Sequence, residues 1–178
     1  GGRAVGWRVG WRERAGKTGP PRWPPASGDS PRFAPDGRRL ASEISDGRQL
    51  DVWTYEGGRD TLTRLTFDAA DDRKPVGTPD GRRIAYRMNN SWDDERRNYR
   101  GAQNRPIWVA DLKTLEVVSP PWTDSKDIDP VWVGDRVFFI SDRDGVANVW
   151  SWDTGTTALV QVTKVTDFDV KALAANAT

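Results

Sequence analysis

The chain of 178 residues contains no cysteine and no histidine. Without cysteine it can form no disulfide, no thiolate nucleophile and no cysteine zinc site. Without histidine it lacks the usual general base and the commonest metal ligand. No run approaches the roughly 18 apolar residues that a membrane span needs. We therefore expect no catalytic residue, no metal, no cofactor and no membrane span.

The chain also has little net charge, +1 in all, but its first 28 residues carry six basic side chains against one acidic. These residues show no apolar periodicity, and their composition predicts a disordered or non-native basic tail at 1–28. The rest of the chain has no basic stripe of the kind that binds a phosphate backbone. Nucleic acid is therefore not an expected partner.

A proline-led segment occurs three times, at residues 30–41, 74–85 and 129–139. A branched apolar residue followed by tryptophan occurs once after each of these segments, at 52–53, 107–108 and 149–150. The intervals between these markers run from 42 to 55 residues. Repeats of that period indicate an array of small all-β units.

Each repeat has the same order of turns and apolar segments. In the first two, a short first strand is followed by Pro-Asp-Gly, which favours a hairpin with a bulge. Three more strand-like segments complete the unit, and four antiparallel strands per repeat are typical of a propeller blade. We predict an all-β fold, an incomplete β-propeller over 29–178 with about three four-stranded antiparallel blades in an open arc. The blades are expected at about 29–68, 69–124 and 125–167, with the start of a next blade at 168–178.

The second repeat is longer because of an insertion between its second and third strands, residues 88–105. Loops of this length in compact domains are commonly functional or disordered, and loops on a rigid sheet are where binding concentrates. The forked donors of arginine suit a carboxylate or a peptide backbone. The candidate contacts for a peptide or protein partner are Trp92, Arg96, Arg97, Tyr99 and Arg100.

Three other groups have both a functional and a structural interpretation. Residues 142–145 begin like a calcium loop but lack its later ligands, so a hairpin turn is predicted. The acidic residues 93–95 run into arginines, which favours a solvated, internally paired loop over an acid–base pair. Tryptophans could line a sugar-binding face, but they recur at similar places in the repeats. Core packing is therefore preferred for Trp53, Trp108, Trp132 and Trp150.

The repeats resemble the blades of TolB-type and tricorn-type six-bladed propellers over about residues 29–178. The resemblance rests on the Pro-Asp-Gly-Arg-Arg segments, the tryptophan strands and the Leu-Thr-Arg-Leu-Thr strand at 62–66. The C-terminal third, from Asp129 to Lys171, is similar to the N-terminal propeller of tricorn-like serine peptidases. The segment from Tyr99 to Leu112 is similar to the same group.

That resemblance implies a propeller that does no chemistry, so this fragment is not expected to be an enzyme. In tricorn-like peptidases such a propeller is thought to filter or guide peptides toward a separate protease core. We expect a non-catalytic segment of such a peptidase, acting in peptide gating or protein–protein interaction. A TolB-like interaction propeller and the sensor propeller of a bacterial protein kinase are the alternatives. The compartment stays open, with the cytoplasm preferred over the periplasm.

Two positions depart from the family pattern. Gly77 stands where an aromatic residue is expected, and truncating a packed aromatic costs about 3–5 kcal/mol. The third repeat has Val133-Gly134-Asp135 in place of Pro-Asp-Gly. Because each blade buries its faces against its neighbours, we expect the open arc to be unstable as a monomer. Missing blades of the same chain, or self-association, are expected to complete it.

Overall fold

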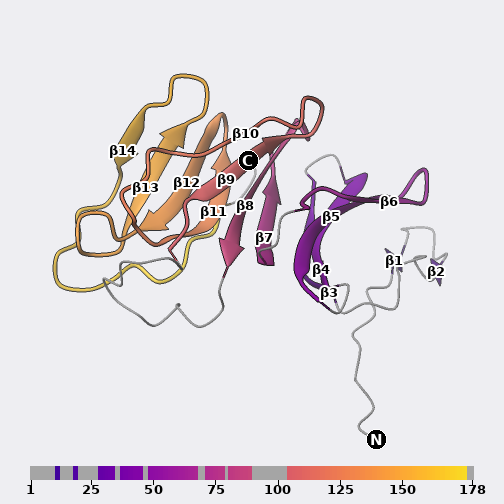
Figure 1. Cartoon of the computed structure of the whole chain (residues 1–178), viewed down its shortest axis with the longest axis horizontal. Coiled ribbons are helices and arrows are strands. Elements are labelled where there is room, and N and C mark those ends of the chain that lie inside the picture. Colours follow the sequence, from indigo (N-terminus) through magenta and orange to yellow (C-terminus); the bar gives the residue numbers. More distant parts are fainter. Residues whose placement is uncertain are drawn as a thin grey trace, which may run out of the picture.

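The computed structural model describes residues 11–12, 18–19, 28–34, 37–45, 48–67, 71–78, 80–89 and 104–175. The regular structure among these residues is entirely β-strand. Twelve strands form three four-stranded sheets, which succeed one another from β3–β6 to β11–β14 (Figure 1). This confirms the predicted all-β fold, because three antiparallel four-stranded sheets, none closed into a barrel, form an incomplete propeller.

Each sheet is a simple meander in which consecutive strands pair. The first blade comprises β3 (Gly28–Phe33), β4 (Arg39–Ser45), β5 (Leu50–Glu56) and β6 (Thr61–Arg64). The second comprises β7 (Asp71–Gly77), β8 (Arg83–Asn89), β9 (Ile107–Asp111) and β10 (Val117–Val118). The third comprises β11 (Asp127–Val133), β12 (Arg136–Ser141), β13 (Asn148–Asp153) and β14 (Leu159–Gln161).

A further pair of short strands precedes the blades. Strand β1 (Trp11–Arg12) pairs antiparallel with β2 (Thr18–Gly19). No strand is expected from the sequence in this part of the chain, because two-residue strands leave no periodic signal.

Glycines close the first turn of each blade in the left-handed region of backbone space. Gly37, Gly81 and Gly134 have φ of 64°, 65° and 58°, values that glycine adopts without the cost a Cβ would add. In the first two blades, the turn glycine N–H also donates to the carbonyl oxygen three residues earlier, from Gly37 to Ala34 and from Gly81 to Thr78. In the third blade only Gly134 and Asp135 separate β11 from β12, whereas residues 34–38 and 78–82 separate the corresponding strands of the other blades. Without Pro-Asp-Gly the hairpin therefore closes through a shorter turn.

The first strand of each blade is interrupted by a bulge before its proline. The register of β3 with β4, β7 with β8 and β11 with β12 shifts at equivalent places. Lys74 and Asp129 occupy these bulges with φ of 51°, and proline, which has no N–H, follows each of them where a ladder bond is not needed. The bulges therefore explain why proline is tolerated inside a strand.

Two apolar clusters join the blades face to face. Ala41 and Val52 of the first blade pack with Ile84 and Tyr86 of the second. The opposite face of the second blade presents Ala85, Ile107 and Val109, which pack against a set from the third blade comprising Trp132, Val137, Phe139 and Trp152. The core therefore lies between the sheets, as in a propeller.

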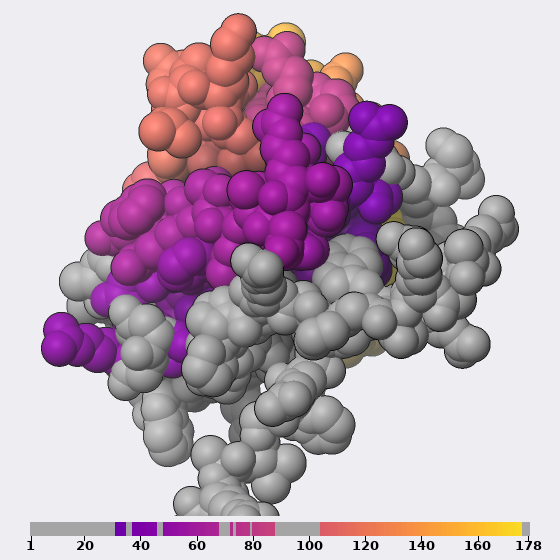
Figure 2. Space-filling view, turned by 90° about the vertical axis from the view of Figure 1, so that its right-hand side faces the viewer, coloured from indigo at the N-terminus to yellow at the C-terminus, as the bar shows by residue number. Residues whose placement is uncertain are grey.

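The first strands lie on the inner side of the arc and the fourth strands on the outer side. Strand β3 contacts β7, and β7 contacts β11. The fourth strands are shorter than the predicted segments at 62–66, 115–118 and 158–163. In the second blade, Leu115 takes a φ of 61° and lies before β10. Figure 2 turns the first blade toward the viewer, with the β9–β10 hairpin projecting above it.

Candidate functional site

The five candidate contact residues, Trp92, Arg96, Arg97, Tyr99 and Arg100, lie outside the described residues, as do the acidic residues 93–95. The structure does describe where their segment is attached. Strand β8 ends at Asn89, and the chain is described again from Asn104. Asn104 is 3% exposed, and its Nδ2 donates to the carbonyl oxygen of Asp124 at 2.8 Å. The insertion therefore connects the two middle strands of the second blade, β8 and β9.

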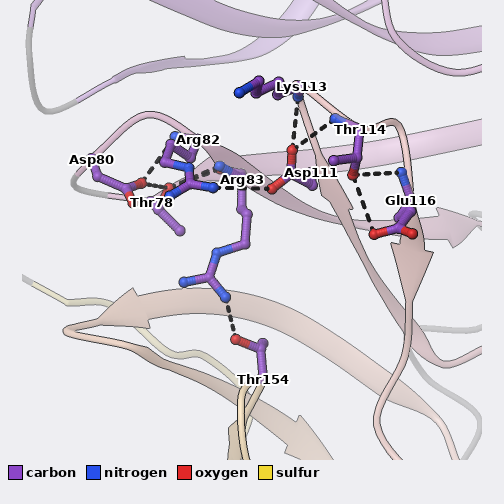
Figure 3. Close-up of polar contacts among 9 residues, drawn as sticks. All are labelled: Thr78, Asp80, Arg82, Arg83, Asp111, Lys113, Thr114, Glu116 and Thr154. Carbon is purple, nitrogen blue, oxygen red and sulfur yellow. Dashed lines mark hydrogen bonds and ion pairs between the residues drawn. The ribbon is translucent and has the colours of Figure 1, made fainter.

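Polar contacts gather at the end of the second blade that carries its Pro-Asp-Gly turn (Figure 3). The carboxylate of Asp80 accepts the Thr78 hydroxyl at 2.5 Å and the Arg82 N–H at 2.9 Å. The Thr78 hydroxyl bond and then the Arg82 backbone bond lower the pKa of Asp80 below its usual value. This carboxylate is therefore ionised at neutral pH, and its hydrogen bonds stabilise the turn in which it lies.

The third-to-fourth strand turns of the second and third blades repeat one arrangement. Asp111 Oδ1 accepts the N–H groups of Lys113 and Thr114 at 2.8 and 3.0 Å. The same bonds run to Asp153 Oδ1 from residues 155 and 156, both at 2.9 Å. Backbone donors lower the pKa of Asp111 and that of Asp153. Carboxylates held ionised in this way build turns and are poorly suited to general acid catalysis.

An arginine begins the second strand of every blade. In two blades it contacts the next blade, and in one it contacts its own. Arg39 Nη1 donates to the carbonyl oxygen of Gly81, in the second blade, at 2.7 Å. Arg83 donates to the Thr154 hydroxyl, in the third blade, as Figure 3 shows. Arg136 instead stays in its own blade, where its Nη2 lies 3.5 Å from Asp153 Oδ2. Arg39 and Arg83 therefore link neighbouring blades, and aligning the three repeats could have identified them.

A buried ion pair fixes the other end of the third blade. Arg143 Nη2 lies 3.2 Å from Asp127 Oδ2, and the two side chains are 6% and 0% exposed. The hydroxyls of Ser141 and Ser125 donate to Asp127 Oδ1 at 2.6 and 2.9 Å. The Arg143 guanidinium also lies over the Trp150 ring, 4.9 Å from its centroid. No sequence pattern indicates this pair, because its members are separated by a strand and a turn.

Burial controls the protonation of this ion pair. Desolvation raises the pKa of Asp127 to about 6, against the charge of Arg143 and the bonds from Ser141 and Ser125, which lower it. Such a pKa would suit a proton-transfer group. The side chain is fully enclosed, however, and its oxygens already accept from the arginine and the serines. The pair therefore organises the blade.

A second charged contact lies on the inner side of the arc. Lys74 Nζ is 2.5 Å from Asp129 Oδ1, and the Lys74 N–H donates to Glu43 Oε1 at 2.8 Å. These three residues come from β7, β11 and β4, so one lysine connects all three blades. Its backbone is also in the left-handed region, a conformation that persists only where the surroundings hold it.

The acidic turn at 142–145 and the repeat tryptophans lie among the described residues. Residues 142–145 form the predicted turn, in which the Gly145 N–H donates to the Asp142 carbonyl at 2.8 Å. Trp132 belongs to the apolar cluster between the second and third blades, and Trp150 packs against that cluster. Trp108 packs against the cluster between the first and second blades. These contacts confirm the packing interpretation for the three tryptophans. Trp53 is half-buried and outside both clusters. Within the described ranges, no acidic cluster could hold a metal ion, and no helix could span a bilayer.

Comparison with known proteins places these blades in a group. The family model described as the tricorn protease N-terminal β-propeller domain matches residues 74–178. A comparison with curated protein sequences finds no match.

Several solved structures are similar in fold. TolB from Acinetobacter baumannii is 19% identical with a TM-score of 0.66, and the match covers 90% of this chain and 38% of that one. TolB from Agrobacterium tumefaciens, described as putative, is 19% identical with a TM-score of 0.58, over 79% and 50% of the two chains. The β-propeller domain of the Trilobed protease from Pyrococcus furiosus is 19% identical with a TM-score of 0.56, over 79% and 43%. The chain therefore spans half or less of the length of these proteins.

Proposed function

Because the chain belongs to the family of tricorn protease N-terminal β-propeller domains, we propose that it is a non-catalytic propeller segment of a tricorn-like serine peptidase. Its role is peptide gating or protein–protein interaction. The observation that carries this proposal is the family match over residues 74–178, which takes in the third blade, the second blade from Lys74 onward and the whole insertion. A propeller acts as a rigid scaffold, and function resides in the loops that its strands carry.

The chemistry of the chain supports a binding role. Serine nucleophiles are usually activated by a histidine, and the sequence contains none. The aspartates at the turns accept backbone N–H groups of their own turns, and the buried Asp127 is paired with Arg143. What these groups stabilise is the arrangement of strands to which the insertion is joined.

The insertion is the proposed peptide contact. Its attachment through Asn104, which bonds to the Asp124 carbonyl, gives it a fixed base. Arg96, Arg97 and Arg100 would supply forked donors to a peptide carboxylate or backbone, and Trp92 and Tyr99 would supply apolar contact area.

A binding measurement tests that contact. We expect replacement of all five residues by alanine to weaken peptide binding at least tenfold. A control variant with alanine at Arg59 and Arg82, two exposed arginines at turns, should leave the affinity unchanged. Equal affinities for the two variants would remove the insertion from the proposal.

The parent protein is tested by the reading frame that contains this chain. A tricorn-like peptidase predicts further blades, a PDZ-like module and a serine peptidase core downstream. An upstream kinase domain would identify a sensor propeller, and an upstream helical domain with a signal peptide would identify a TolB-like protein. Either finding would overturn the peptidase proposal.

A further inference from the structure

Position 77 has an aromatic counterpart in each of the other blades. Two residues after the repeat proline stand Phe33, Gly77 and Trp132. Trp132 faces the second blade, where it is 8% exposed, and its indole Nε1 donates to the Val76 carbonyl at 3.1 Å. The Arg83 guanidinium lies over the Trp132 ring, 5.1 Å from its centroid. The interface between the second and third blades thus shows how an indole is held at this position.

At the interface between the first and second blades, the equivalent position is Gly77, which supplies no ring. A hollow of about 20 Å³ lies there instead. Its walls are mostly apolar and are formed by both blades, including Ala41, Thr54, Gly77, Ile84 and Leu112. A Cβ built on Gly77 would meet only the Arg83 carbonyl oxygen, at 3.9 Å. Among the described residues, position 77 can therefore accept a Cβ without a clash.

The repeat equivalents of the polar partners of Trp132 are nevertheless present in the first blade. Arg39 is the repeat equivalent of Arg83 and lines the hollow. Arg32 is the equivalent of Val76, so its carbonyl oxygen corresponds to the acceptor of the Trp132 N–H. Arginine over an indole face is a favourable cation–π arrangement. The residues that line the hollow thus include the repeat equivalents of the cation and of the backbone acceptor that the next interface uses.

From this equivalence we propose that the hollow beside Gly77 binds the tryptophan side chain of a peptide. This inference rests on the proposed peptide-binding role and names the side chain that the propeller selects. The indole takes the place that Trp132 fills at the next interface, beneath the Arg39 guanidinium.

Binding requires a movement of Arg39. The hollow has room for about one water molecule as it stands, and Arg39 Nη1 is bonded to the Gly81 carbonyl. The guanidinium must leave Gly81 and move over the ring, which is the arrangement that Arg83 adopts with Trp132. Because the hollow is partly open to solvent, a side chain can enter without separating the blades.

The test is a titration of the isotope-labelled 178-residue chain with N-acetyltryptophanamide, followed by NMR. We expect saturable shifts of the Gly77 and Gly81 amide signals, with an affinity at least tenfold higher than for N-acetylleucinamide. The variant Gly77→Trp supplies its own indole, so it should lose this binding and melt at a higher temperature. Gly58→Trp, at a glycine whose Cβ meets nothing within 4 Å, is the matched control and should bind as the parent chain does.

A second variant keeps the test independent of how well Gly77→Trp folds. Arg39→Gln removes the cation while leaving the hollow, and it should weaken N-acetyltryptophanamide binding at least fivefold. Absence of saturable shifts, or equal affinity for the leucine compound, would overturn the proposal. Shifts of the Gly77 signal with protein concentration alone would assign the occupant to a second copy and would also overturn it. The reading-frame result is unaffected by these outcomes, so the two proposals can fail separately.

Discussion

Lys74 and Asp129 occupy the same position in two successive blades, and their side chains meet with 2.5 Å between Nζ and Oδ1. Both residues lie in the bulge of a first strand and share a φ of 51°. The Lys74 backbone also bonds to Glu43 of the first blade. A bulge that disturbs the ladder within each blade therefore supplies a polar connection between blades on the inner side of the arc.

This ion pair should contribute little to stability. The lysine and aspartate side chains are 41% and 14% exposed, and exposed pairs are worth about 0.2–1 kcal/mol. A double-mutant cycle with Lys74→Met and Asp129→Asn, measured by urea unfolding, should give a coupling energy in that range. The coupling should shrink as salt is added. A coupling well above 1 kcal/mol that is insensitive to salt would mean that the pair is far less hydrated than its exposure indicates.

Gly81 and Gly134 offer a matched test of the turn glycines. Alanine at either position must adopt a positive φ, which costs about 1–2 kcal/mol. At Gly81 the new Cβ would also lie 1.8 Å from Arg39 Nη2, whereas at Gly134 it would meet nothing within 4 Å. Gly81→Ala must therefore displace the guanidinium and break its bond to the Gly81 carbonyl, so the unfolding free energy should fall by about 1 kcal/mol more than in Gly134→Ala. Equal losses would show that the Arg39 bond contributes nothing.

The sequence predicts the blades well because their signals are local. Turn glycines, alternating apolar residues and the tryptophan marker recur at a fixed order, and each acts within one hairpin. The contacts that join the blades are different in kind. Asp127 and Arg143 are paired across a strand, and Arg83 and Thr154 are 71 residues apart. Such pairings depend on how the sheets pack, which a pattern of residues does not specify.

The hollow beside Gly77 shows what the repeat does specify. The sequence marks Gly77 as a missing aromatic, and the structure places an open space there. The sequence does not reveal that Arg39, beside that space, donates a hydrogen bond to the Gly81 carbonyl oxygen. For the insertion, the sequence is more informative than the structure. Its composition indicates a contact surface, whereas the structure describes only where it is attached, at Asn104.

A threonine after the fourth strand serves the same purpose in the first and third blades. Thr66 Oγ1 accepts the Val52 N–H at 3.0 Å, and Thr163 Oγ1 accepts the Val149 N–H at 2.9 Å. Replacing either by valine leaves an N–H without its acceptor, at about 1–3 kcal/mol when buried. Thr66→Val should cost more than Thr163→Val, because Thr66 is buried and Thr163 is half-exposed. Thermal unfolding measures both, with the serine variants as controls that keep the hydroxyl.

The Asp127–Arg143 pair predicts how stability varies with pH. Because burial raises the pKa of Asp127 to about 6 from 3.8, the folded chain binds a proton more tightly than the unfolded chain between those values. The unfolding free energy contributed by this group is therefore highest below pH 3.8 and falls as the pH rises through 6, by about 1.4 kcal/mol per pKa unit. Asp127→Asn cannot titrate, so the stability of the parent chain relative to this variant should decline across the same window. A carboxyl carbon signal of Asp127 that titrates near pH 4, with a flat difference in stability, would show that Arg143 and the two serines outweigh the burial.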